Sequence, residues 1–241
     1  MKYDMQDAPW IVILTGPNGA GKSTFYDKVI NEWDEFRNVQ FVNMDNYAKY
    51  MAKPSENVED YLLQASRFVK CTIDDNLEKK RSFVYETTAS GLTHLRIMER
   101  AKKEGYNIAT IFIGLSNVEL SHLRVQKRVS EGGHNVHPED INRRYPNILK
   151  NLPALLERSD IFAIFDNSYK KPFQLILFAD KEDIMYFQEY PEWLNTALKG
   201  RKTYKNFIKM TPQDIKKIQK DSVEFAKIVF AKKVTKKDIN K

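Results

Sequence analysis

The chain has 241 residues, 42% apolar and 29% charged, which is an ordinary composition for one soluble α/β domain. No apolar run approaches the roughly 20 residues of a membrane helix, and the N-terminus lacks the apolar core of a secretory signal, so we expect a cytoplasmic protein without a membrane span. The net charge of +7 is concentrated in residues 198–241, which hold 14 Lys and Arg against 4 Asp and Glu, so it does not mark the whole chain as a nucleic-acid-binding protein.

Short apolar runs alternate along the chain with segments of helical periodicity. The runs predict strands at residues 10–15, 39–44, 82–86, 108–113 and 161–165, with a sixth at 173–178. The periodic segments predict helices at residues 22–33, 56–80, 92–104, 117–130, 139–158 and 211–232. Gly105 stands where a left-handed residue would end the third of these helices. The alternation predicts an α/β fold with a mostly parallel sheet and helices on both faces.

The turn after the first strand carries a phosphate-binding motif. Residues 16–24 read Gly-Pro-Asn-Gly-Ala-Gly-Lys-Ser-Thr, which satisfies the pattern GxxxxGK[ST] between a strand and a helix. Backbone N–H groups of such a loop surround a polyphosphate, its lysine reaches the β- and γ-phosphates, and its Ser hydroxyl binds Mg²⁺. The motif predicts a P-loop NTPase three-layer sandwich with ATP and Mg²⁺ as cofactors, Ser23 at the metal, and nucleotide contacts from Gly16, Asn18, Gly19, Ala20, Gly21, Lys22, Ser23 and Thr24.

Carboxylates follow the second and third predicted strands. Asp45 comes after the second strand, and Glu86-Thr87-Thr88 comes after the third. Ligands of open α/β sheets collect at these strand ends. There Asp45 could accept a proton from an attacking hydroxyl or help to hold Mg²⁺, while a carboxylate beside hydroxyls suits a polyol or a sugar. We therefore predict that Asp45, Glu86, Thr87 and Thr88 bind the phosphate acceptor, although turn formation or capping would also explain such residues.

Four arginines bracket a Gly-Gly loop at residues 131–138. They are Arg124, Arg128, Arg143 and Arg144. Phosphoryl transfer builds negative charge that planar guanidinium groups stabilise, and a loop with arginines at both ends would form a lid over the phosphates. We expect two of the four to be catalytic, together with Lys22 and Asp45, and choose Arg128 and Arg143 because they lie nearest the loop ends.

The C-terminal segment and the single cysteine complete the organisation. We divide the chain into a kinase domain at 1–197 and a basic helical extension at 198–241, whose aromatic residues fit an amphipathic helix packed on the body. Cys71 is the one cysteine, which fits a reducing compartment. It lies among Phe68, Val69 and Ile73, and this context predicts a buried thiol.

Over about residues 10–170 the chain resembles the zeta toxin family, P-loop kinases that phosphorylate UDP-N-acetylglucosamine or related nucleotide sugars, and it is most similar to the compact chromosomal branch. The motifs that carry the likeness are the phosphate loop (16–24), Phe-Val-Asn-Met-Asp (41–45), Glu-Thr-Thr-Ala-Ser-Gly (86–91), Gly-Gly-His-Asn-Val (132–136), Arg-Arg-Tyr (143–145), Lys-Asn-Leu-Pro (150–153) and Asp-Asn-Ser (166–168).

The resemblance implies roles for the residues already singled out. Asp45 would be the catalytic base, Glu86 with Thr87 or Thr88 would contact the sugar, and Arg128 and Arg143 would be the lid arginines. It also allows the chain to be the toxin of a toxin–antitoxin pair, with a protein antitoxin that obstructs the ATP site. The spacing of the arginines from residues 150–153 differs from the best-known toxins, which leaves the second arginine open.

Two other classes of protein remain open. The phosphate loop is also common in ABC-type ATPases, but residues 130–134 (Ser-Glu-Gly-Gly-His) and Asp166-Asn167 match their signature and Walker B motifs poorly. The basic extension could instead bind nucleic acid phosphates, although an amphipathic helix packed on the body explains it better.

Overall fold

The computed structural model describes residues 8–32, 39–170, 172–180, 184–186, 191–199 and 207–209. Within these ranges the strands are β1 (Trp10–Thr15), β2 (Gln40–Val42), β3 (Phe83–Thr87), β4 (Asn107–Gly114), β5 (Ile161–Asp166), β6 (Gln174–Asp180), β7 (Ile184–Tyr186) and β8 (Phe207–Lys209). The helices are α1 (Lys22–Lys28), α2 (Met44–Met51), α3 (Leu62–Glu78), α4 (Thr93–Lys103), α5 (Val118–Ser130), α6 (Pro138–Arg158) and α7 (Glu192–Leu198), with short 3₁₀ turns η1 (Ile30–Glu32) and η2 (Val58–Tyr61).

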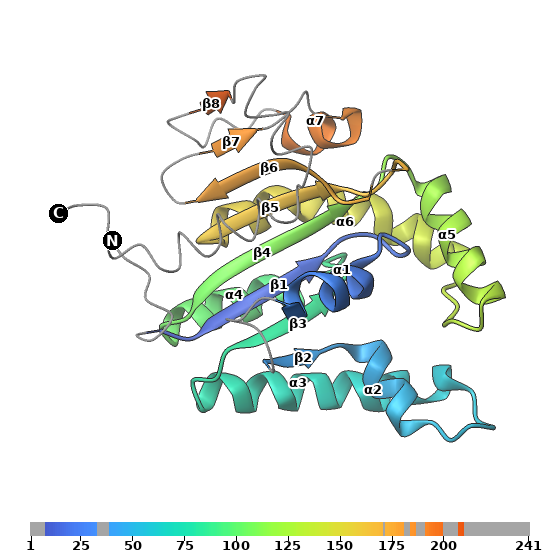
Figure 1. Cartoon of the computed structure of the whole chain (residues 1–241). Helices are drawn as coiled ribbons and strands as arrows, with labels where there is room; N and C mark the ends of the chain where they lie inside the picture. The colour runs from blue at the N-terminus through green and yellow to red at the C-terminus, as the bar shows by residue number, and fades with distance from the viewer. Residues whose placement is uncertain are drawn as a thin grey trace.

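The described strands form one eight-stranded sheet in the order β2-β3-β1-β4-β5-β6-β7-β8 (Figure 1). The first five strands of this order run parallel, β6 is antiparallel to both of its neighbours, and β7 pairs in parallel with β8. Every residue of β1, β4 and β5 is buried, as expected for strands covered on both faces. The predicted P-loop NTPase architecture is confirmed.

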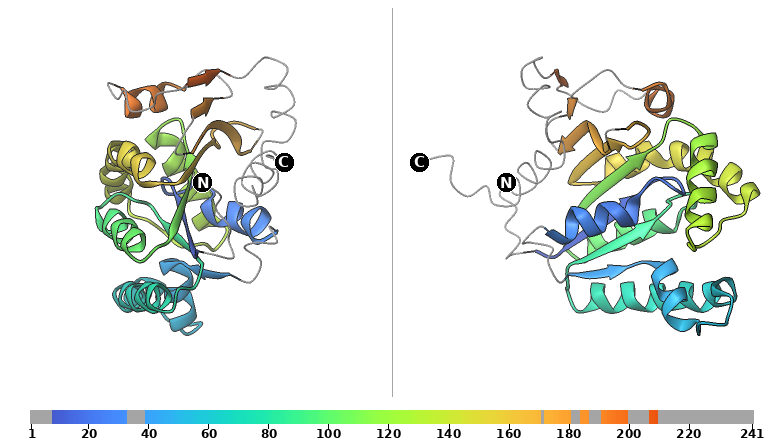
Figure 2. Two further views of the ribbon diagram at one scale, coloured as in Figure 1. Left: turned by 90° about the vertical axis from the view of Figure 1, so that its left-hand side faces the viewer. Right: turned by 45° about the vertical axis from the view of Figure 1, so that its right-hand side comes forward.

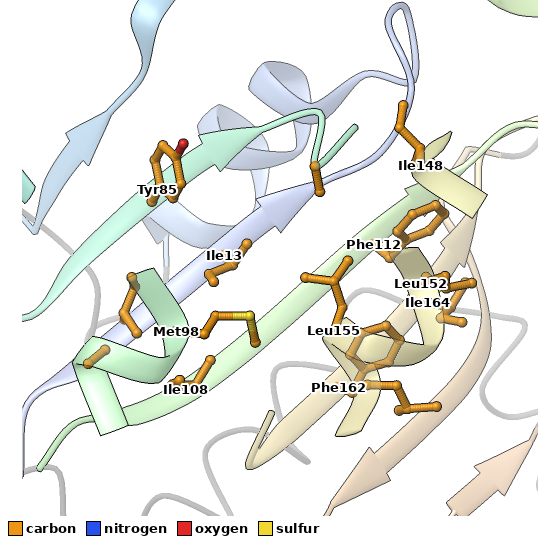
Figure 3. Close-up of a cluster of buried hydrophobic side chains, with 14 of the residues drawn as sticks. Ile13, Tyr85, Met98, Ile108, Phe112, Ile148, Leu152, Leu155, Phe162 and Ile164 are labelled. Atoms are coloured by element: carbon orange, nitrogen blue, oxygen red, sulfur yellow. The ribbon is translucent and has the colours of Figure 1, made fainter. Parts of the chain in front are cut away.

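Two apolar clusters fill the space between the sheet and its helices. Helices α3, α4 and α6 cover one face, and α1 covers the other, as the edge-on view in Figure 2 shows. Figure 3 shows the first cluster, in which Met98 of α4 and Leu155 of α6 lie over Ile13 of β1 and Phe162 of β5. Helix α7 extends this layer and packs the Trp193 ring on Phe112 of β4, with ring centroids 5.9 Å apart.

The N-terminal part of the chain departs from the predicted boundaries. The helix expected at 22–33 ends at Lys28, and η1 follows it, while Trp33 lies outside the described residues. The strand expected to run to residue 44 ends at Val42, because the side chain of Asn43 accepts the backbone N–H of Asn46 and starts α2. The strand pattern concealed this cap, and α2 was not predicted.

Other expectations met different outcomes. Cys71 is exposed on the outer side of α3, so the predicted buried thiol is wrong. Val69 and Ile73 face the core, and residue 71, two positions from each, lies on the opposite side of the helix. Gly105 is left-handed (φ 81°), and its N–H and that of Tyr106 bond to carbonyls in the last turn of α4, which confirms the predicted helix end.

The C-terminal extension is described only in part. Strand β8 lies within residues 198–241 and pairs with β7, whereas the predicted helix at 211–232 lies outside the described residues. The boundary at 197/198 therefore stays a prediction. Among the helices that the structure describes, none is both long and apolar enough to cross a membrane.

Gly114 offers a test of the packing between α7 and β4. A Cβ at this position would lie 2.3 Å from the Trp193 ring, so we expect Gly114→Ala to destabilise the fold by about 1–3 kcal/mol through overpacking. The measurement is thermal unfolding followed by circular dichroism. Gly91→Ala is the matched control, because a Cβ there meets nothing within 4 Å. Equal melting temperatures for the two variants would contradict the close approach of α7.

Candidate active site

The phosphate loop connects β1 to α1 at the carboxyl edge of the sheet (Figure 1). Gly16 and Gly21 have φ angles of 141° and 88°, in the region that favours glycine. A Cβ on Gly16 would lie 2.1 Å from the Ile113 carbonyl oxygen, so the loop leaves the sheet with its backbone against β4. Two side chains also hold the backbone of the loop. The Asn167 amide donates to the Ala20 carbonyl, and the Ser121 hydroxyl donates to the Asn18 carbonyl.

Lys22 is buried at the inner rim of this loop. Its Nζ donates to the Gly16 and Pro17 carbonyls at 3.0 Å each. Burial lowers the pKa of Lys22, while the charges of Glu86 and Asp45 act in the opposite direction. The predicted phosphate lysine and the two predicted acceptor carboxylates therefore lie within electrostatic reach of one another.

Glu86 contacts the predicted metal residue directly. Because β3 lies beside β1, with Glu86 opposite Leu14, the Ser23 hydroxyl can donate to Glu86 Oε2 at 3.0 Å. Burial raises the pKa of Glu86, and the Lys22 charge and the hydrogen bond from Ser23 oppose that shift. A hydroxyl and a carboxylate are hard oxygen ligands of the kind that Mg²⁺ accepts, so the donor set fits the metal. From the sequence, Glu86 was predicted only to bind the phosphate acceptor and not the metal.

Asp45 lies in the first turn of α2, two residues after the Asn43 cap, and not at a strand end as expected. It nevertheless lines a cavity of about 450 Å³ at the carboxyl edge of the sheet. This cavity collects most of the predicted residues: Asn18, Gly19, Lys22, Ser23, Asp45, Glu86, Thr87, Thr88, Arg128, Arg143 and Arg144. Gly16, Ala20, Gly21 and Thr24 do not line it.

Part of the cavity wall was not recognised in the sequence: Leu62, Ser66 and Val69 of α3 line the cavity, together with Glu59 of η2. Residues 134–137 of the loop between α5 and α6, which the sequence had predicted as a lid, line it as well. The periodicity of α3 predicted only which residues face the core. It could not indicate that one end of the same helix lines a cavity. Ser90 is a further lining residue, within a motif that the sequence had singled out.

The structure separates the lid arginines. The Nε and one Nη of Arg128 are buried without a hydrogen-bond partner among the described residues, and the charge of Arg128 lowers the pKa of Lys22. The charge of Arg144 acts on Lys22 in the same direction. The charge of Arg143 is not among the causes that shift the pKa of Lys22. The Arg143 side chain is 64% exposed, whereas the Arg144 side chain is 28% exposed.

Asp140 and Asn167 hold the remaining guanidinium groups. Arg143 and Arg144 both form ion pairs with Asp140, three and four residues earlier on α6. Arg124 does not line the cavity; it donates to the Asn167 carbonyl and packs against Gly19. The geometry thus favours Arg128 and Arg144, rather than Arg128 and Arg143, as the pair that faces a phosphate near Lys22.

A strand–phosphate loop–helix unit in this sheet order, with a buried lysine and arginines that line one cavity, defines a P-loop protein of the kinase-like class. The zeta toxin family model matches residues 1–173, and the chain belongs to that family. None of the curated proteins is similar enough to match.

Solved structures show the same fold. The PezAT chromosomal toxin–antitoxin system of Streptococcus pneumoniae is similar with a TM-score of 0.55 and 16% identity, over 92% of this chain and 88% of that chain. AvrRxo1-ORF1:-ORF2 with ATP is similar with a TM-score of 0.59 and 16% identity, over 72% of this chain and 61% of that chain, so the match spans less than two thirds of that protein's length. The native AvrRxo1-ORF1:-ORF2 complex gives a TM-score of 0.61 and 13% identity, over 95% and 80%. At these identities the likeness is one of fold.

The arginine assignment predicts a different effect for each substitution. Arg128→Ala and Arg144→Ala should each lower the kcat of ATP turnover by at least about 100-fold, the usual loss when a group that stabilises developing charge is removed. Arg143→Ala should change kcat by less than about threefold, since an exposed ion pair contributes little. The measurement is steady-state ADP release. A loss in Arg143→Ala as large as that in Arg144→Ala would overturn the assignment.

Proposed function

We propose that this chain is an ATP-dependent kinase that transfers the γ-phosphate to a sugar hydroxyl of UDP-N-acetylglucosamine or a related nucleotide sugar. The observation that carries the proposal is the grouping, in one cavity, of the phosphate lysine Lys22, the acids Asp45 and Glu86, and the unpartnered N–H groups of Arg128. Family membership and the kinase-like fold support phosphoryl transfer, and the resemblance of residues 41–45 and 86–91 to zeta toxins supports the nucleotide sugar.

On this proposal the cavity has a nucleotide end and an acceptor end. Backbone N–H groups of the phosphate loop and the Lys22 ammonium bind the β- and γ-phosphates. Arg128 and Arg144 donate to the oxygens of the transferring group and stabilise the charge that builds there. Ser23 and Glu86 would hold Mg²⁺, which when bound neutralises phosphate charge and aligns the nucleotide.

At the acceptor end, Asp45 takes the proton from the attacking hydroxyl. Its place in the first turn of α2 puts Asp45 in the wall of the same cavity as the phosphate loop and the hydroxyl-bearing residues 87, 88 and 90. The hydroxyls of Thr87, Thr88 and Ser90 can exchange hydrogen bonds with a sugar. Leu62 and Val69 give the same space an apolar side.

The other readings are less well supported. In an ABC-type engine the signature segment completes a partner's nucleotide site, whereas here the loop that includes His134 and Asn135 lines the cavity of its own chain. A nucleic-acid-binding role would rest on residues 198–241, most of which lie outside the described residues.

We also propose that a protein antitoxin covers the ATP site, as the family pattern implies. Two of the similar solved structures are complexes or systems of paired proteins, one of them described as toxin–antitoxin. Steric obstruction of this cavity would suffice to inhibit the kinase.

The decisive experiment is mass spectrometry of products after incubation of the protein with ATP, Mg²⁺ and a panel of nucleotide sugars and free sugars. We expect one phosphate to be added to UDP-N-acetylglucosamine or a relative. Asp45→Ala should abolish that product while ATP binding stays within about twofold, because a base touches the acceptor rather than the nucleotide. ATP hydrolysis without any phosphorylated sugar would contradict the proposal. Collapse of ATP affinity in Asp45→Ala would instead give Asp45 a metal-binding role.

A further inference from the structure

The segment between β3 and α4, residues 88–92, which we name the acceptor loop, is tied to α6 by one side chain. Asn151 of α6 donates from its amide nitrogen to the Ala89 and Gly91 carbonyls, at 2.9 Å each. Asn151 follows Arg144 by seven residues, two turns of helix, so both side chains lie on the same side of α6. One helix therefore contacts both ends of the cavity.

The acceptor loop has an unusual backbone at the point where Asn151 holds it. Ala89 is left-handed (φ 55°), a conformation that residues with a Cβ seldom adopt. Its N–H bonds to Thr87 Oγ1, and its side chain is buried in the core. Strained backbone of this kind persists only where surrounding contacts enforce it, and it gathers at functional sites.

The hydroxyls of the acceptor loop depend on that conformation. Thr88 Oγ1 and Ser90 Oγ lie 3.2 Å apart, and both residues line the cavity. Residues 88 and 90 alternate with residues 89 and 91. Asn151 bonds to the carbonyls of both Ala89 and Gly91, and the Ala89 side chain is also buried in the core. If the carbonyls of residues 89 and 91 were released, the two hydroxyls between them would lose their fixed separation.

We propose that Asn151 is a positioning residue for the phosphate acceptor: its amide fixes the acceptor loop so that Thr88 and Ser90 present a preset pair of hydroxyls to the sugar. For the acceptor's identity this rests on the proposed function, whereas the restraint of the loop does not. The side chain suits the task because a primary amide has two N–H donors for two carbonyls, whereas an aspartate of the same shape has none.

Asn151 should act on the acceptor and not on ATP. The phosphate loop is held by residues 121 and 167 and packs on β4, and Ser23 bonds to Glu86 of β3; none of these contacts involves residues 89–91. Loss of the amide should therefore raise the KM for the nucleotide sugar by about tenfold, equivalent to about 1.4 kcal/mol, and leave the KM for ATP within about twofold.

The test compares Asn151→Asp and Asn151→Ala with the wild-type protein and with Asn147→Ala. Asn147 is a matched control, because it lies one turn earlier on α6 and its amide donates only within the helix, to the Arg143 carbonyl. Two readouts are needed: the KM for UDP-N-acetylglucosamine and for ATP, and amide hydrogen exchange over residues 88–92. We expect both Asn151 variants to raise the acceptor KM alone and to speed exchange in the acceptor loop, with Asn147→Ala like wild type.

Asn151→Gln keeps two donors on a longer stem and should restore part of the acceptor affinity. A parallel rise in both KM values, or no change in acceptor KM, would overturn the proposal by reducing Asn151 to a structural or neutral residue. If the wild-type protein phosphorylates no nucleotide sugar, the proposed function fails and hydrogen exchange alone decides. Unchanged protection of residues 88–92 in Asn151→Asp would then show that the amide does not restrain the loop.

Discussion

The backbone of Gly16 passes so close to the Ile113 carbonyl that a Cβ would lie 2.1 Å from its oxygen, and the geometry of the cavity depends on this contact. It sets where the phosphate loop leaves the sheet, because β1 and β4 pair in parallel register directly before it. From that point the loop must turn back toward α1, and the left-handed Gly21 makes the turn. Lys22 and Ser23 then begin α1 beside the end of β3, within reach of Glu86.

Opposite charges are brought together here at close range. Lys22 is buried, Glu86 is half-buried, and each moves the pKa of the other toward its charged form against the effect of desolvation. Arg128 adds buried N–H groups that no described residue satisfies, which is costly unless an anion binds them. These charges suit a polyanion with its counter-ion, which the proposed ATP and Mg²⁺ would supply.

Helix α6 connects the two ends of this cavity. Its first turns carry Arg144 with its ion-pair partner Asp140, its middle carries Asn151, and its last turns pack Leu155 and Leu156 in the core. Anchoring in the core gives the polar residues a fixed base. On the proposed function, a single element would therefore carry a phosphate-facing arginine and also hold the loop that faces the acceptor.

The sequence by itself determined the order of β1 to β6 and of α1 and α3 to α6, though not α2, and also the phosphate loop and the helix end at Gly105, because these depend on residues adjacent in the chain. It also grouped most of the cavity residues, since parallel strands end at a shared edge. Only the tertiary structure decided that Glu86 contacts Ser23, 63 residues away, that the Arg144 charge acts on the pKa of Lys22, and that Cys71 is exposed. Those facts depend on how elements distant in sequence are rotated against one another, and a local pattern of residue types does not record that rotation.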